Sequence, residues 1–478
     1  MFSSFIPRIL IAATSCKAGK SLLVLGLVVA LRKRGLSVSC CVTGDALHQA
    51  LIFSRLTRRY TRVLDRRLLS EGDLMASLYQ AGLGADIVII DGHGGLYDGV
   101  KSNENLGSDA ELAVLTNTPT VLLSELREAS NSVAALVRGF THFKGAPQIA
   151  ALIANHVAPH AADPLLPPPV LGFLNECMDA YALPRFIGGI PESVFTGQLP
   201  PSILSQHENF TALPMQFFND VGNLVENHID IDALIQIAGT AAPIQLQEPL
   251  ADPQKRLCRF AVTDDSCFNI CYQDNLDLLR YYGAEIVPFS PMIDNDLPRK
   301  IGGLYITGAY ISSYCEELAR NEQLRRSIKQ FAEAGGVIYS EGAGTAYLCR
   351  SYQIEKGGPT YPGVGLIPAE AFTVQQPHAL LEAELIDDSV LGLTGVKLRG
   401  ATTGEWGLRS MHAGAGGQVV NTMRIHIPRC SPVNEGYSSS AQTCSTFHFL
   451  HFGSNSQVAK SLVDAALVHE RSKPPVDD

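Results

Sequence analysis

The residues with the clearest chemical potential lie in a short loop near the start of the sequence. Residues 13–21 are Ala-Thr-Ser-Cys-Lys-Ala-Gly-Lys-Ser. The loop follows an apolar run and opens a helix-like pattern, and in that context backbone N–H groups and a helix N-terminus hold phosphates. Lys20 is therefore expected to reach the β- and γ-phosphates of a nucleotide, and the Ser21 hydroxyl to ligate Mg²⁺. Thr14 stands where such a loop usually has its first glycine.

Acidic residues follow two of the expected strands. Asp91 ends the apolar run 87–90, Asp45 follows an earlier strand, and Asp98 lies in the glycine-rich turn 92–99. The carboxyl ends of parallel strands meet at one edge of a sheet, so these acids are expected near the phosphate loop, with Asp45 and Asp91 as Mg²⁺ ligands. The alternative is that Asp45 and Asp98 only cap turns. For His93, a place in the turn and a functional role are equally good explanations.

Short apolar runs alternate with helix-length segments through the first half of the chain. Residues 8–12, 37–42 and 85–91 are expected strands, and residues 20–34 are an expected helix. The runs at 120–124 and 149–153 repeat the pattern. Strands that are apolar throughout and separated by helices predict a parallel sheet with helices on both faces, the doubly wound α/β class.

A change of composition marks the end of this pattern. Residues 231–257 are rich in Ala, Gln and Pro and are predicted to be a linker. A second alternation of strands and helices follows, beginning with an expected strand at 260–262. The sequence therefore predicts two α/β domains, at 1–230 and 258–470, and a frayed polar tail at 471–478.

Composition and charge exclude several classes of protein. The net charge is −10 and no long Lys/Arg-rich run is present, so nucleic acid is not expected as a partner. The longest apolar helix, at 22–31, is too short to span a bilayer, which predicts a soluble, cytoplasmic protein that does not bind membranes. The eleven cysteines show no paired Cys-x-x-Cys spacing and are predicted to be reduced thiols rather than zinc ligands.

Together these motifs resemble the cobyrinate a,c-diamide synthase family. In the first half, the phosphate loop, Asp45, residues 63–65 and residues 91–99 follow that family's order. In the second half, the resemblance is to the family's class I glutamine amidotransferase domain, at residues 264–269, 275–276, 289–291, 296–298 and 317–321. The resemblance covers most of the chain. It implies a P-loop domain similar to dethiobiotin synthetase, followed by a flavodoxin-like glutamine amidotransferase domain.

The chemistry of that family supplies further expectations. Its members activate a carboxylate of a corrin-type macrocycle with ATP as a phosphate ester, which ammonia released from glutamine then displaces. The resemblance implies ATP and Mg²⁺ as cofactors and a small-molecule carboxylate as acceptor. It also implies a homodimer, or a partner glutaminase or paralogue. The implied nucleotide-binding residues are Ser15, Lys17, Gly19, Lys20 and Ser21, and the implied amidation residues are Asp45, Asp98 and Asp91, the last in place of the family's usual glutamate.

The sequence departs from the family where the glutaminase residues should lie. In the stretch 339–348, Gly342 occupies the position of the cysteine nucleophile, and glycine has no side chain that can attack an amide. Phe449 aligns with the family's histidine, although His448 and His451 are close by, and Ala401 replaces a second histidine. Cys349 is not expected to substitute, because a buried helical thiol is usually inert. These losses predict that the second domain does not hydrolyse glutamine.

Two further departures concern the first half. Residues 199–204 lack an arginine and a histidine that the family has there, and Lys17 stands where the family prefers glycine. Three hypotheses remain. In the first, the chain is an ATP-dependent amide ligase that uses free ammonia or ammonia from a partner. In the second, it is a pseudoenzyme that binds a nucleotide or an active partner. In the third, it is a ParA-like ATPase switch.

Overall fold

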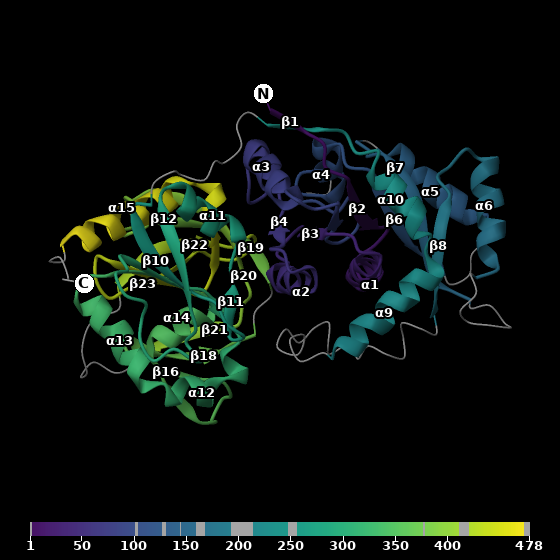
Figure 1. Cartoon of the computed structure of the whole chain (residues 1–478). Helices are drawn as coiled ribbons and strands as arrows, with labels where there is room; N and C mark the ends of the chain where they lie inside the picture. The colour runs from purple at the N-terminus through teal and green to yellow at the C-terminus, as the bar shows by residue number, and fades with distance from the viewer. Residues whose placement is uncertain are drawn as a thin grey trace. The chain divides into compact units, whose positions relative to one another are not determined.

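The computed structural model describes residues 2–100, 104–126, 131–143, 145–158, 168–192, 214–246, 256–375, 378–410 and 420–472. The chain divides into two compact units, Met1–Pro249 and Leu250–Asp478 (Figure 1). The helices that the structure describes are all too short or too polar to cross a bilayer.

The first unit is built on a sheet of seven parallel strands in the order β4-β3-β5-β2-β6-β7-β8. Every residue of β2, β3 and β5 is buried, and because successive side chains point to opposite faces, both faces of the sheet must be covered. The strands are β2 (Arg8–Ala13), β3 (Val38–Val42), β4 (Arg62–Val63), β5 (Ile87–Asp91), β6 (Thr120–Glu125), β7 (Ile149–Val157) and β8 (Phe186–Pro191).

Helices α1 to α6 connect the parallel strands β2 to β8 in sequence order, and α9 and α10 follow β8. α1 packs tightly on α9, where a Cβ on Gly26 would lie 2.4 Å from Val225 Cγ2. The Ser70 and Ser108 hydroxyls cap the N-termini of α3 and α4. The helices are α1 (Lys20–Lys33), α2 (Leu47–Thr57), α3 (Glu71–Gly82), α4 (Asp109–Thr116), α5 (Ser132–His142), α6 (Val170–Ala180), α9 (Met215–His228) and α10 (Ile231–Ala238).

The predicted linker 231–257 differs from what the structure describes. Residues 231–238 form α10, and β9 (Ile244–Leu246) pairs antiparallel with β1 (Phe2–Ser4). The fully buried Arg8 of β2 donates from Nη2 to the Ala242 carbonyl at 2.7 Å, which joins this segment to the central strand. Apolar residues at helical spacing in α10 bury one face of the helix, a pattern that the Ala- and Gln-rich composition concealed.

The second unit contains a ten-stranded mixed sheet in the order β12-β10-β13-β15-β24-β23-β22-β19-β20-β25. Its first five strands are parallel and the rest are antiparallel. The strands are β10 (Cys258–Thr263), β12 (Ala284–Phe289), β13 (Gly303–Ile306), β15 (Val337–Glu341), β19 (Ala379–Leu385), β20 (Lys397–Thr402), β22 (Val420–His426), β23 (Val433–Ser438), β24 (Thr443–Thr446) and β25 (Phe449–His451).

Smaller elements surround this sheet. β16 (Cys349–Gln353), β17 (Thr360–Pro362), β18 (Ile367–Thr373) and β21 (Trp406–Ser410) form a second sheet, and β11 (Phe268–Ile270) pairs with β14 (Gly308–Ala309). The helices are α11 (Gln273–Tyr281), α12 (Cys315–Arg320), α13 (Glu322–Glu333), α14 (Ala343–Leu348) and α15 (Gln457–Ser472), with 3₁₀ turns η2 (Ile311–Ser313) and η3 (Phe452–Ser454). Buried cores cover both faces of the parallel part of the main sheet, because alternate residues of β10, β13 and β15 belong to different clusters. The predicted α/β class is confirmed in both units.

Candidate functional site

The phosphate loop lies between β2 and α1, at the carboxyl end of a central strand. β2 has β5 on one side and β6 on the other, which is the position where open parallel sheets bind ligands. Gly19 precedes α1 with a φ of +92°, and a Cβ there would lie 2.8 Å from Asn155 Nδ2. Asn155 Nδ2 in turn donates to the Ala18 carbonyl at 2.7 Å. The glycine and the asparagine therefore fix the end of the loop together.

Ser15 and Lys17 lie at the exposed tip of this loop. Lys17 has a φ of +67°, in the left-handed region where a residue with a side chain costs about 1–2 kcal/mol relative to the right-handed region. This is the position where glycine was expected from the family resemblance. The exposed tip of the loop therefore carries a cationic side chain.

Lys20 and Asp91 meet below the loop. Lys20 is buried and its Nζ donates to the Gly94 carbonyl. Asp91, at the end of β5, hydrogen-bonds with Ser21, and burial raises the pKa of its carboxyl to about 7 although Ser21 and Lys20 oppose the shift. Asp91 Oδ1 is buried without a hydrogen-bond partner among the described residues. The structure thus brings together the predicted residues Lys20, Ser21 and Asp91.

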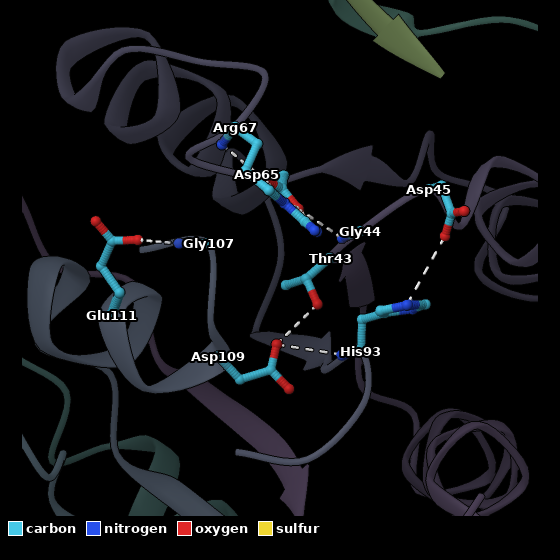
Figure 2. A network of polar contacts seen from close by, with 9 residues as sticks. All are labelled: Thr43, Gly44, Asp45, Asp65, Arg67, His93, Gly107, Asp109 and Glu111. Carbon is cyan, nitrogen blue, oxygen red and sulfur yellow. Dashed lines mark hydrogen bonds and ion pairs between the residues drawn. The ribbon is translucent and has the colours of Figure 1, made fainter. Parts of the chain in front are cut away.

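Asp109, the first residue of α4, is a member of this site that the sequence analysis missed. Its Oδ1 accepts hydrogen bonds from Thr43 Oγ1 at 2.8 Å and from the His93 backbone N–H at 3.1 Å (Figure 2). Burial also raises the pKa of Asp109 to about 7, and the nearby Asp91 adds to the shift. The only sequence signal was a Ser-Asp pair typical of a helix start, which indicates a cap and not a site.

Asp45 lies at the same sheet edge, but its side chain is directed toward His93. Its Oδ1 is 3.8 Å from His93 Nε2, and Figure 2 shows the two side chains turned toward each other. The neighbouring Asp65 accepts from the Gly44 N–H at 3.0 Å and pairs with Arg67. Asp98 accepts from the Gly95 N–H at 2.7 Å, so it closes the glycine-rich turn.

The donor set near Lys20 suits magnesium. Among the described ranges, no group of three or more His, Cys, Asp and Glu residues is gathered as a metal centre. Magnesium bound with a nucleotide does not need one, because it usually takes one or two carboxylates, a hydroxyl, waters and phosphate oxygens. The Ser21 hydroxyl and the unpartnered oxygen of Asp91 match that requirement.

In the second unit, Gly342 follows β15 and precedes α14 in a sharp turn. Its φ is +54° and its ψ is −134°, and a Cβ there would lie 2.7 Å from Phe449 Cζ. The same ring would lie 2.2 Å from a Cβ on Gly308. Phe449 also pairs in register with Ala401 of β20. The phenyl ring therefore fills the space beside Gly342, the position at which the family resemblance implies a nucleophile.

The titratable groups around this turn are held in other contacts. Glu341 is buried and accepts from Tyr305 at 2.7 Å and Tyr339 at 2.6 Å, and burial raises its pKa to about 7. His448 Nε2 lies 2.6 Å from Glu435 Oε2. Cys349 is buried, and burial raises the pKa of its thiol well above the ordinary value. A buried thiol with a raised pKa is a poor nucleophile.

The stretch 199–204 lies outside the described residues.

Comparison with known proteins gives consistent matches over both units. The family profile of the CobB/CobQ-like glutamine amidotransferase domain matches residues 259–385. The cobyrinate a,c-diamide synthase of Listeria monocytogenes serotype 4b (strain F2365) is 32% identical over 406 residues, which cover 82% of this chain and 85% of that protein. The cobyrinate a,c-diamide synthase of Dehalococcoides mccartyi (strain CBDB1) is 28% identical over 486 residues, which cover 96% and 97%. Among solved structures, PurLQS from Thermotoga maritima matches 44% of this chain and 98% of that chain, with a TM-score of 0.32 and 15% identity.

Proposed function

The chain belongs to the cobyrinate a,c-diamide synthase family, and on that premise we propose that it is an ATP- and Mg²⁺-dependent amide ligase whose ammonia does not come from its own second unit. The acceptor is a carboxylate of cobyrinate or of a related tetrapyrrole. The ammonia is free ammonium from solution, or it comes from a partner glutaminase.

The first unit would bind and activate the nucleotide. Backbone N–H groups of the loop at 15–19 and the N-terminus of α1 would hold the phosphates, and Lys20 would leave the Gly94 carbonyl to contact the β- and γ-phosphates. Ser21 and Asp91 would hold Mg²⁺, which neutralises phosphate charge when bound. Asp45 and Asp98 lie in loops at the same sheet edge, where the acceptor carboxylate would approach.

The reaction would then proceed in two steps. The acceptor carboxylate attacks the γ-phosphorus of ATP, and the bond to ADP breaks to give an acyl phosphate. Ammonia attacks the acyl carbon, inorganic phosphate leaves with the C–O bond pair, and the nitrogen releases a proton to give a primary amide. For this chain the role of the protein is to position the reactants and to stabilise charge on the phosphates.

The observation that carries the second part of the proposal is the contact between Gly342 and Phe449. A glutaminase needs a nucleophile at the turn and a base beside it. Here the turn has no side chain, and the space beside it is occupied by a phenyl ring. Both changes remove nucleophilic attack on the glutamine amide. They therefore support the loss of glutamine hydrolysis, rather than a nucleophile at another residue.

The test is amidation of cobyrinic acid by the purified full chain with ATP and Mg²⁺, followed by mass spectrometry. We expect amide formation with ammonium and none with glutamine, and we expect Lys20→Ala to lose the activity. Release of glutamate from glutamine above a protein-free control would refute the loss of glutaminase activity. Absence of amide with ammonium at any concentration would refute the ligase proposal.

The clustered loss of glutaminase residues also favours a second candidate, a pseudoenzyme that binds a nucleotide or an active paralogue. It differs from the first in one measurable respect. Titration calorimetry with a non-hydrolysable ATP analogue and Mg²⁺ would show binding that depends on Lys20, while no carboxylate acceptor would be amidated. Co-purification with an active glutaminase or paralogue would then identify the partner.

A further inference from the structure

Hydrogen bonds from described residues hold only one of the two carboxylate oxygens of Asp109. Asp109 is 2% exposed and begins α4, an eight-residue helix whose N-terminus favours a negative charge. Its Oδ1 is fixed by Thr43 Oγ1 at the end of β3 and by the His93 N–H after β5. The other oxygen, Oδ2, is buried and has no hydrogen-bond partner in the part of the chain that the structure describes.

Asp109 Oδ2 lies against the backbone just past Asp91. A Cβ on Gly92 would be 2.1 Å from that oxygen, so the glycine leaves the space that the carboxylate occupies. Asp91 is 3% exposed and also has one buried oxygen, Oδ1, without a partner among the described residues. Two buried acids from different elements therefore each leave one oxygen unsatisfied at the same sheet edge.

The charges in this region are not balanced by the side chains. Lys20 attracts both Asp91 and Asp109, burial removes both carboxyls from water, and Asp91 repels a negative charge on Asp109. One lysine cannot neutralise two ionised carboxylates. An unsatisfied buried carboxylate oxygen costs free energy unless a cation or a donor meets it. A divalent cation would satisfy both oxygens and both charges together.

We propose that Asp109 is a second carboxylate ligand of the nucleotide-bound magnesium, beside Asp91 and Ser21. This rests on the proposed nucleotide site. Two carboxylates, one hydroxyl and phosphate oxygens make a donor set that Mg²⁺ accepts. Asp45, which the sequence placed in that set, is turned toward His93 instead (Figure 2). The ion would also tie the starts of α1 and α4 to the end of β5.

The experiment measures metal binding rather than turnover. Mn²⁺ is titrated into the full chain with a non-hydrolysable ATP analogue and followed by electron paramagnetic resonance, for the wild type and for Asp109→Asn. The asparagine keeps an oxygen for Thr43 and His93 but removes the charge. Asp86→Asn is the matched control, because Asp86 also accepts one backbone N–H, from Ser37 at 2.7 Å, at the opposite end of β5.

We expect Asp109→Asn to weaken Mn²⁺ binding about 10–100-fold, as the loss of groups that support a metal site does. Its affinity for the nucleotide in EDTA should be unchanged or higher, and the control should match the wild type. A variant that binds Mn²⁺ as the wild type does would overturn the assignment of Asp109 alone. A wild type that binds no nucleotide with or without metal would overturn the proposed function as well.

A measurement on the wild type keeps the proposal open to refutation if Asp109→Asn does not fold. A crystal structure with Mg²⁺ and the same analogue should place Asp109 Oδ2 about 2.0–2.1 Å from the ion, the distance of a direct magnesium ligand. An ion held by Ser21 and Asp91 with Asp109 beyond that distance would overturn it.

Discussion

The contact between the Phe449 ring and the Gly342 turn predicts an energetic coupling between these two positions. Replacing Gly342 with alanine adds one methyl group, which would lie 2.7 Å from Cζ, 3.2 Å from Cε2 and 3.4 Å from Cε1 of Phe449. These three atoms are absent from leucine. Phe449→Leu should therefore remove the collision and leave the backbone as it is.

The expected magnitude has two parts. Overpacking a close-packed core costs about 1–3 kcal/mol, and a non-glycine residue in a sparsely populated backbone conformation costs about 1–3 kcal/mol. Gly342→Ala should thus destabilise the second unit by roughly 3 kcal/mol in the wild type, where both parts apply. In the Phe449→Leu background only the backbone part remains, so the double-mutant cycle should show a favourable coupling of about 1–2 kcal/mol.

The protein offers a selective probe for this measurement. Its single tryptophan, Trp406, lies in β21 of the second unit, so tryptophan fluorescence during urea unfolding reports on that unit. Gly357→Ala is the matched control, because Gly357 has a φ of +81° and nothing within 4 Å of an added Cβ. Gly357→Ala should lower the free energy of unfolding through its backbone conformation alone, by the same amount with Phe449 and with Leu at position 449. Equal effects of Gly342→Ala in both backgrounds would refute the filled site.

Three further predictions follow from individual contacts. Burial raises the pKa of Glu341 from 4.5 to about 7, so the folded unit keeps a proton that the unfolded chain releases. The contribution of Glu341 to the stability of this unit should be fully present below pH 4.5 and fall by about 3 kcal/mol as the pH rises from 4.5 through 7. Trp406 fluorescence should show this fall, and Glu341→Gln should flatten it; an unchanged pH profile would contradict the assignment. Asn155→Ala should weaken binding of Mg²⁺ and the ATP analogue about 5–10-fold in calorimetry, because the loop loses the bond to the Ala18 carbonyl; equal affinity would show that the loop needs no such support. Arg8→Met should destabilise the first unit by about 2–4 kcal/mol in circular dichroism, because buried carbonyls, including that of Ala242, lose their donor; wild-type stability would mean that those carbonyls find other partners.

Local pattern was enough for the elements that carry the proposed nucleotide site. The run at 8–12, the Gly-Lys-Ser triplet and the helix from Lys20 specify a strand, a loop and a helix through their own composition. The apolar run that ends at Asp91 specifies a buried parallel strand in the same way. The order of motifs over both halves was also enough to place the chain in its family. These features depend on residues that are close together in the sequence, so the sequence alone determined them.

The tertiary structure decided the features that depend on distant residues. Asp109 is a helix cap by local pattern, and it becomes a site residue only because α4 begins beside the ends of β3 and β5. The segment 231–246 has the composition of a linker, yet Arg8 and β1 recruit it into the first unit. Gly342 and Phe449 are 107 positions apart, and only the fold shows that the phenyl ring fills the space beside the Gly342 turn, where the family resemblance implies a nucleophile. Such contacts come from packing between elements, which a single sequence does not display.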